Sequence, residues 1–187
     1  DRNRLIALPD IPSDDPASAA AELQRCIKMG HRGVIISSVA DTIRRGVKPI
    51  FDESWHRFWD IAQEARIPIH IHLGGGWHSI EPVLRSWRFA AMVAVAPVQL
   101  DEILVGMIFS GILEQRPEVN FVLGESGLGW IPYMLERMDH EIHKFGPQLE
   151  DHRLDMLPSE IFHRQVLVTY EDEKFGVECI PRIGVDN

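Results

Sequence analysis

The chain has 187 residues, of which 45% are hydrophobic and 25% charged, so it resembles an ordinary globular domain and can bury one sizeable core. A formal net charge of −9 argues against binding to nucleic acid or to an anionic membrane surface through general electrostatics. The only cysteines, Cys26 and Cys179, form no CxxC motif, which argues against a thiolate metal site and fits a reducing cytoplasm.

The ends and the apolar segments give no sign of a targeting or membrane-spanning sequence. The first ten residues, DRNRLIALPD, do not resemble a signal peptide. No apolar run reaches the ~18 residues of a transmembrane helix, and the longest one, at 89–98, contains Pro97. We therefore expect a cytoplasmic protein with no transmembrane helix.

Short apolar strands are predicted to alternate with amphipathic helices along the whole chain. The strands are expected at residues 4–8, 33–38, 68–73, 119–125 and 165–170. The helices are expected at residues 17–29, 52–65, 82–115 (one or two helices, interrupted near Pro97), 129–144, 159–164 and 172–183. For the first helix, Asp15 is the predicted N-cap, Pro16 the first helical residue and Gly30 the terminator.

This alternation predicts an α/β fold with a parallel sheet and right-handed crossovers. Two architectures remain open: a doubly wound open sheet, or part of a (β/α)8 TIM barrel. A complete barrel has eight β/α units and typically ~250 residues. The chain shows about five units, so a barrel would be incomplete.

Two histidines stand in one apolar strand, in the sequence IPIHIHLGGG at 67–76. Side chains two residues apart in a strand face the same side, so His70 and His72 are expected to point together, with His72 nearer the carboxyl end of the strand. Neutral imidazole binds zinc and related metals and also serves as a general base. The glycines after the strand, Gly75 among them, let the backbone approach a ligand. Either histidine could instead be hydrogen-bonded within a core layer.

Acidic residues end two later strands. Glu125 follows the strand at 119–125 and precedes a glycine turn, where an unpaired carboxylate would be costly to bury. It could meet a metal, a base or water, or it could instead cap the next helix or pair with an arginine such as Arg137 or Arg164. Glu171 and Asp172 end the last strand, where a solvated or helix-capping role is the simpler expectation.

Aromatic residues are expected in the loops at the same rim. Trp77, His78 and Trp130 lie in these loops and could wall an apolar or aromatic substrate. No GxGxxG or GxxxxGK[ST] motif follows any strand, which disfavours a doubly wound nucleotide-binding protein.

Three stretches together carry a family resemblance: IPIHIHLGGG, SGILEQRPEVNFVLGESGLGWIPYMLERMD (110–139) and LPSEIFHRQVLVTYED (157–172). They resemble the amidohydrolase-related family, in the branch of aminocarboxymuconate-semialdehyde decarboxylase and the resorcylate-type decarboxylases. The resemblance runs through essentially the whole chain. It implies a metal-dependent (β/α)8 barrel whose members are mostly decarboxylases without an organic cofactor, and in some cases hydrolases.

The resemblance also implies roles for individual residues. His72 matches the strand histidine that binds the metal, which would be a divalent ion, zinc or manganese. Glu125 stands where the family often has the histidine of an LGHxG motif, so it is the candidate catalytic acid or base or a further metal ligand. His70, Gly75, Trp77 and Trp130 are the candidate substrate-binding residues. The family also implies a small-molecule substrate and a homodimer.

Two ligand motifs of the family are missing from the sequence. The family's first strand carries an HxH or ExH pair, which would lie before Asp1, and its last ligand is an aspartate that would follow Asn187. Residues 1–187 are therefore expected to form one partial barrel domain that lacks roughly the first two strands and the last. The function expected is that of a metal-dependent decarboxylase of a small carboxylated substrate, aromatic or not. The alternatives are a hydrolase of a C–N or C–O bond and a non-catalytic partial-barrel module.

Overall fold

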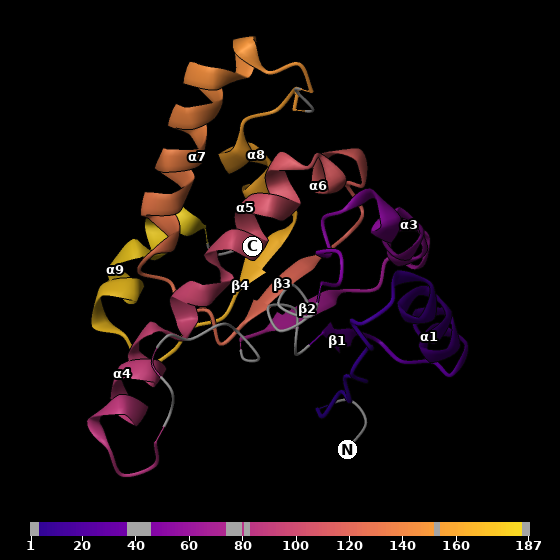
Figure 1. Ribbon diagram of the computed structural model, residues 1–187, viewed down its shortest axis with the longest axis horizontal. Coiled ribbons are helices and arrows are strands. Elements are labelled where there is room, and N and C mark those ends of the chain that lie inside the picture. The colour runs from indigo at the N-terminus through magenta and orange to yellow at the C-terminus, as the bar shows by residue number, and fades with distance from the viewer. Residues whose placement is uncertain (1–3, 37–45, 74–79, 81–82, 152–153, 185–187) are drawn as a thin grey trace.

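A computed structural model describes residues 4–36, 46–73, 80, 83–151 and 154–184, and its centre is a parallel sheet (Figure 1). The strands are β1 (Val34–Ile36), β2 (Ile69–His72), β3 (Phe121–Gly124) and β4 (Val166–Val168). Their order in the sheet is β1-β2-β3-β4, the order in which they occur along the chain. A doubly wound sheet reverses direction at a switch point, whereas a barrel adds each strand beside the previous one. The structure therefore has the winding of a barrel.

The prediction of a strand at 4–8 is wrong. Leu5 is 79% exposed, and the N-terminal segment meets the sheet slightly later, through a single parallel bridge between Asp10 and Ile35. Ile11 N donates to Ile35 O at 2.8 Å, and Ile35 N donates to Pro9 O at 2.9 Å. Pro9 has no backbone N–H to extend the ladder, which explains why the pairing stays this short.

Helices fill the intervals between the strands, as predicted. They are α1 (Pro16–Lys28), α3 (His56–Ala65), α4 (Trp87–Val95), α5 (Asp101–Phe109), α6 (Ile112–Gln115), α7 (Ile131–Phe145), α8 (Pro158–Gln165) and α9 (Lys174–Ile183). Short 3-10 turns stand at Glu53–Trp55, Pro97–Leu100 and Gly146–Gln148. In Figure 1, α1 and α3 lie beside the β1–β2 end of the sheet, and α7 and α9 lie beyond β4.

Two local predictions for the helices are confirmed. The carboxylate of Asp15 accepts a hydrogen bond from Ser18 N at 2.8 Å, with Pro16 as the first helical residue. Gly30, just after the end of α1, has a φ of +83°, which favours glycine. The long helical region at 82–115 is divided by the 3-10 turn that begins at Pro97, because proline cannot supply the next helical N–H.

The register of the sheet sorts its side chains onto two faces. Val34, Ile69, Phe121 and Val166 are aligned across the four strands, and all are buried in the core that the helices cover. Ile35, His70, Val122 and Leu167 form the next aligned row, on the opposite face. His72 lies on that opposite face too, at the carboxyl end of β2, so the predicted common orientation of His70 and His72 is confirmed.

One apolar segment stands out at the surface. Within the described residues, Trp87–Phe109 is long and apolar enough to cross a membrane by length and composition, although the sequence analysis expected no such segment. Its second half, α5, buries Ile103, Leu104 and Met107 in the protein core. Its first half, α4, has no buried residue, and Trp87 and Val93 are exposed.

Candidate functional site

The carboxyl ends of β2 and β3 bring together the two residues that sequence analysis put first. His72 is paired with Gly124 in the sheet register, and Glu125 follows Gly124 directly. A Cβ atom at Gly124 would lie 3.4 Å from Ile71 O and 3.7 Å from His72 Cδ2. The imidazole ring of His72 therefore packs directly beside the end of β3.

Glu125 turns the chain out of β3 in a conformation that is unusual for its residue type. Its φ is +53°, in the left-handed region, where a non-glycine residue costs about 1 kcal/mol or more. In this conformation its Oε2 lies 3.2 Å from Nε2 of His72. Backbone strain of this kind concentrates at functional sites, so the geometry supports a functional role for the pair.

The hydrogen bond at the other ring nitrogen of His72 defines what Nε2 can do. Nδ1 of His72 contacts Leu73 O, and because a carbonyl oxygen only accepts, this contact favours the tautomer with the proton on Nδ1. Nε2 therefore presents its lone pair toward Glu125, or a second proton if the ring is charged. A lone pair and a carboxylate repel each other unless a proton or a cation lies between them.

The pair suits a divalent cation as well as a proton. Two ligand atoms that share one zinc ion at ~2.0–2.1 Å lie roughly 3.0–3.4 Å apart, and the His72–Glu125 separation of 3.2 Å falls in that range. A backbone carbonyl that holds the second nitrogen of a ligating histidine is the usual supporting contact. In the part of the chain that the structure describes, no three His, Cys, Asp or Glu side chains gather as a metal site. His72 and Glu125 can thus supply at most part of a coordination sphere.

Glu171 adds a further carboxylate to this edge of the sheet. It is half-buried after β4, and its pKa is raised above the usual value, first by burial and then by the negative charges of Glu125 and Glu173. Glu173 is the N-cap residue of α9, so neither Glu171 nor Asp172 caps this helix, while Asp172 is exposed, in agreement with the predicted solvated role.

Residues that the sequence analysis did not single out hold the turn after β3 in place. Ser126 is fully buried, and its Oγ accepts from Thr169 N at 3.1 Å, while Thr169 Oγ1 donates to Leu123 O at 3.1 Å. The carboxylate of Glu173 accepts hydrogen bonds from the backbone N–H groups of Leu128 and Gly129. These contacts form because β3 and β4 are neighbours in the sheet, and the sequence alone does not show that they are neighbours.

The remaining candidate residues lie farther from this pair or outside the description. His70 lies one layer deeper, aligned with Ile35 and Val122, and burial lowers the pKa of its imidazole below the usual value. Trp130 donates its indole N–H to Ser126 O at 2.7 Å, so part of its ring closes the turn. Gly75 and Trp77 lie outside the described residues.

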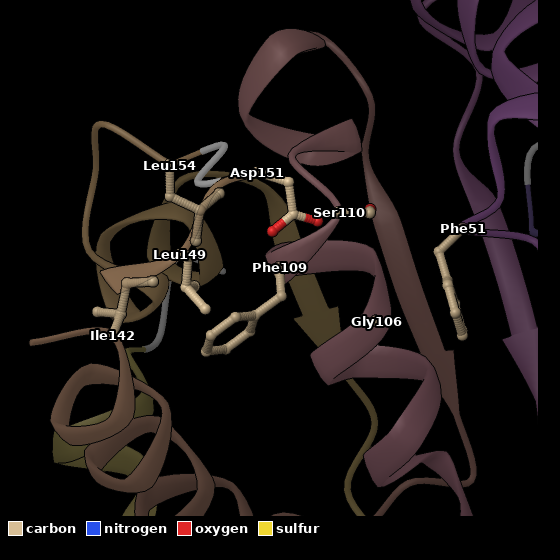
Figure 2. A pocket seen from close by; sticks show the side chains of 8 residues that line it. All are labelled: Phe51, Gly106, Phe109, Ser110, Ile142, Leu149, Asp151 and Leu154. Carbon is tan, nitrogen blue, oxygen red and sulfur yellow. The ribbon is translucent and has the colours of Figure 1, made fainter. Parts of the chain in front are cut away.

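One cavity in the described part of the chain lies away from this pair, in the helical layer. It has a volume of about 390 Å³, and Figure 2 shows apolar side chains around it with the carboxylate of Asp151. Its lining residues are Phe51, Gly106, Phe109, Ser110, Ile142, Leu149, Asp151 and Leu154. None of these residues ends a strand. The cavity is therefore separate from the carboxyl ends of β2 and β3, where the candidate catalytic residues lie.

Comparison with known proteins links this arrangement to one family. A family model described as amidohydrolase matches residues 2–158. Gamma-resorcylate decarboxylase of a Rhizobium species is 28% identical over 153 residues, which cover 74% of this chain and 43% of that protein. The chain thus spans less than half the length of this relative.

Solved structures show the same fold. An amidohydrolase of Mycobacterium avium subsp. paratuberculosis matches with a TM-score of 0.78 at 22% identity, over 98% of this chain and 47% of that one. A dihydroxybenzoic acid decarboxylase of Polaromonas, with bound manganese and the inhibitor 2-nitroresorcinol, matches with a TM-score of 0.70 at 20% identity, over 98% of this chain and 56% of that one. The four-stranded sheet therefore corresponds to part of an amidohydrolase barrel.

Proposed function

Because the chain belongs to the amidohydrolase family, we propose that the protein that contains it is a metal-dependent decarboxylase of a small hydroxylated aromatic acid. The observation that carries the proposal is the contact between His72 Nε2 and Glu125 Oε2 at the carboxyl edge of the sheet. Active sites of barrel enzymes lie at this edge. The decarboxylase among the relatives supports the reaction, and the manganese-containing neighbour supports a divalent metal, manganese or zinc.

Each of the two residues has a separate role in this proposal. His72 would hold the metal through Nε2, because a proton on Nδ1, which the contact with Leu73 O favours, leaves the Nε2 lone pair for the metal. A bound divalent metal would supply positive charge that stabilises the negative charge developing on the substrate. Glu125, in its protonated form, gives its proton to the ring carbon while the bond from that carbon to the carboxylate breaks. The electron pair of the broken bond stays on the ring carbon and forms the new C–H bond, and CO2 leaves.

Substrate contacts are assigned to the side chains around this pair. His70 has the depressed pKa of a partly buried imidazole, so near neutral pH it can offer a hydrogen bond without charge. Trp130 lies at the N-cap of α7, where its ring can flank an aromatic substrate. Gly75 and Trp77, which follow β2 in the sequence, complete the proposed substrate contacts.

The protein is proposed to act as a homodimer in the cytoplasm. Cys26 and Cys179 are buried free thiols, which suits a reducing compartment. Light scattering of the full-length protein would give its mass in solution, and a monomer would contradict the dimer.

The function is tested with the full-length protein loaded with Mn2+ and supplied with a panel of ortho-hydroxybenzoic acids and their amides and esters. CO2 release from one of the acids, with the phenol formed in equal amount, is the expected result. Release of an amine or alcohol from the amides or esters instead would identify a hydrolase of a C–N or C–O bond. A full-length protein that does neither would support a non-catalytic module.

A further inference from the structure

We propose that Glu173 is a positioning residue that holds the turn after β3 and thereby keeps Glu125 against His72. The inference rests on the proposed roles of Glu125 and His72. It assigns a task to a carboxylate that the reaction itself does not use.

The contacts of Glu173 point away from its own helix. Although it is the N-cap residue of α9, its side chain makes no capping hydrogen bond there. Its Oε2 instead accepts from Gly129 N at 3.0 Å, and its Oε1 accepts from Leu128 N. These two N–H groups lie just before α7, where the helix dipole also favours a negative charge. A carboxylate that accepts two backbone N–H bonds is held by charge-assisted hydrogen bonds.

Glycines on both sides leave room for this carboxylate. A Cβ atom at Gly176, in α9, would lie 2.3 Å from Cδ of Glu173, so a side chain there would displace the carboxyl group. Cβ atoms at Gly127 and Gly129 would lie 3.1 Å from Oε1 and 3.2 Å from Oε2. Gly127 also has a φ of +62°. The turn after β3 and the first helical turn of α9 thus fit closely around the carboxyl group of Glu173.

The turn that Glu173 holds is the one that directs Glu125. Glu125 and Gly127 flank Ser126 and both have positive φ values, so the chain reverses sharply within three residues. Ser126 is fixed on one side by Thr169, at the end of β4. Glu173 fixes Leu128 and Gly129 on the other side. With both sides held, the backbone of Glu125 has little freedom, and its carboxylate reaches His72 Nε2 at 3.2 Å.

The test compares Glu173→Gln with Glu178→Gln in the full-length protein. Glutamine has the same shape as glutamate but presents an NH2 group to one of the two N–H donors. Glu178 lies on the same helix with its side chain in solvent, which makes it the matched control. Hydrogen exchange of Leu128 and Gly129 should speed up about tenfold in Glu173→Gln and stay unchanged in Glu178→Gln.

A second readout follows the geometry of the site without any turnover. In protein labelled with 15N-histidine, the NMR signals of the His72 ring should shift in Glu173→Gln and not in Glu178→Gln. His72 signals that stay in place while the two amides lose protection would overturn the proposal, since the turn would then move without moving Glu125. If Glu173→Gln unfolds, the same measurements on Glu173→Asp decide between these two outcomes.

Activity separates this inference from the proposed function. In an active enzyme, Glu173→Gln should lower kcat about 10- to 100-fold with little change in KM, because a displaced proton donor affects the chemical step. In the Glu125→Gln background the same change should cause no further loss, and an additive loss would contradict a role through Glu125. If no decarboxylation is found at all, the proposed function fails, while the exchange and NMR results still decide whether Glu173 positions Glu125.

Discussion

The two ends of the sheet use polar residues in opposite ways. At the amino end, Gln165 is only 3% exposed, and its Nε2 donates to Arg116 O and to Val119 O at 3.0 Å each. At the carboxyl end, the side chains of His72 and Glu125 are 39% and 58% exposed and meet each other across two strands. Buried polar groups tied to the backbone stabilise a fold, whereas exposed titratable groups in strained turns can react. This difference is the reason why we propose that the amino end contributes stability and the carboxyl end carries the chemistry.

Glu125→Gln in the full-length protein should break the reactive end with the largest effect. Glutamine keeps the size of the side chain and removes its proton, so kcat should fall about 10²- to 10⁴-fold. The thermal unfolding midpoint should stay within a few degrees of the wild type. Steady-state kinetics and a thermal melt check both numbers, and a variant with near wild-type kcat would remove Glu125 from the reaction.

His72→Ala should weaken metal binding at the same end. Loss of a direct ligand should exceed the about 10- to 100-fold loss in affinity that follows removal of an outer-shell partner. Titration calorimetry with Mn2+ measures this on the full-length protein. His140→Ala, on the exposed face of α7, is the control and should bind Mn2+ as the wild type does. Equal affinities for the two variants would contradict the assignment of the metal to His72.

Gln165→Leu should damage the other end instead. The carbonyl groups of Arg116 and Val119 would lose their buried donor, at a cost of about 2 kcal/mol in the free energy of unfolding. Denaturant unfolding of the full-length protein gives the loss, and kcat at a temperature where the variant stays folded should not change. If the variant kept its stability but lost kcat, Gln165 would act in the reaction and not in folding. The proposed difference between the two ends would then be wrong.

Glu171→Gln should produce the smallest effect and only at higher pH. The pKa of Glu171 is raised in the folded protein, so ionisation of this group opposes folding. This cost is absent below the usual glutamate pKa and grows as the pH rises through the raised value. The variant should match the wild type at about pH 4 and be more stable by about 0.2–0.5 kcal/mol at about pH 7.5. A variant that is more stable than the wild type only at the lower pH would contradict the raised pKa of Glu171.

The sequence allowed His72 and Glu125 to be placed at one edge because both arguments are local. Alternation within a strand orients His72, and the end of an apolar strand locates Glu125. The helix cap at Asp15 is equally local and was predicted correctly. The strand predicted at 4–8 does not form, because Pro9 restricts pairing with the sheet to a single bridge. The apolar composition of the segment gives no sign of this restriction.

The rest of the site depends on contacts between distant segments. The left-handed conformation of Glu125 could not be predicted, because a glutamate is rarely found there and the local sequence would assign such a bend to the glycines beside it. The contacts of Thr169 and Glu173 with this turn depend on the position of β4 next to β3. Each of them acts on a turn more than forty residues away in the sequence.

The central claim is that Glu125 transfers a proton at the carbon that loses CO2. It is tested most directly by running the reverse proton transfer, with the Mn2+-loaded full-length protein and the phenolic product in D2O without CO2. The account predicts that deuterium enters the ring at the carbon beside the hydroxyl group, and that Glu125→Gln abolishes this exchange. Exchange that continues undiminished in Glu125→Gln would contradict the account.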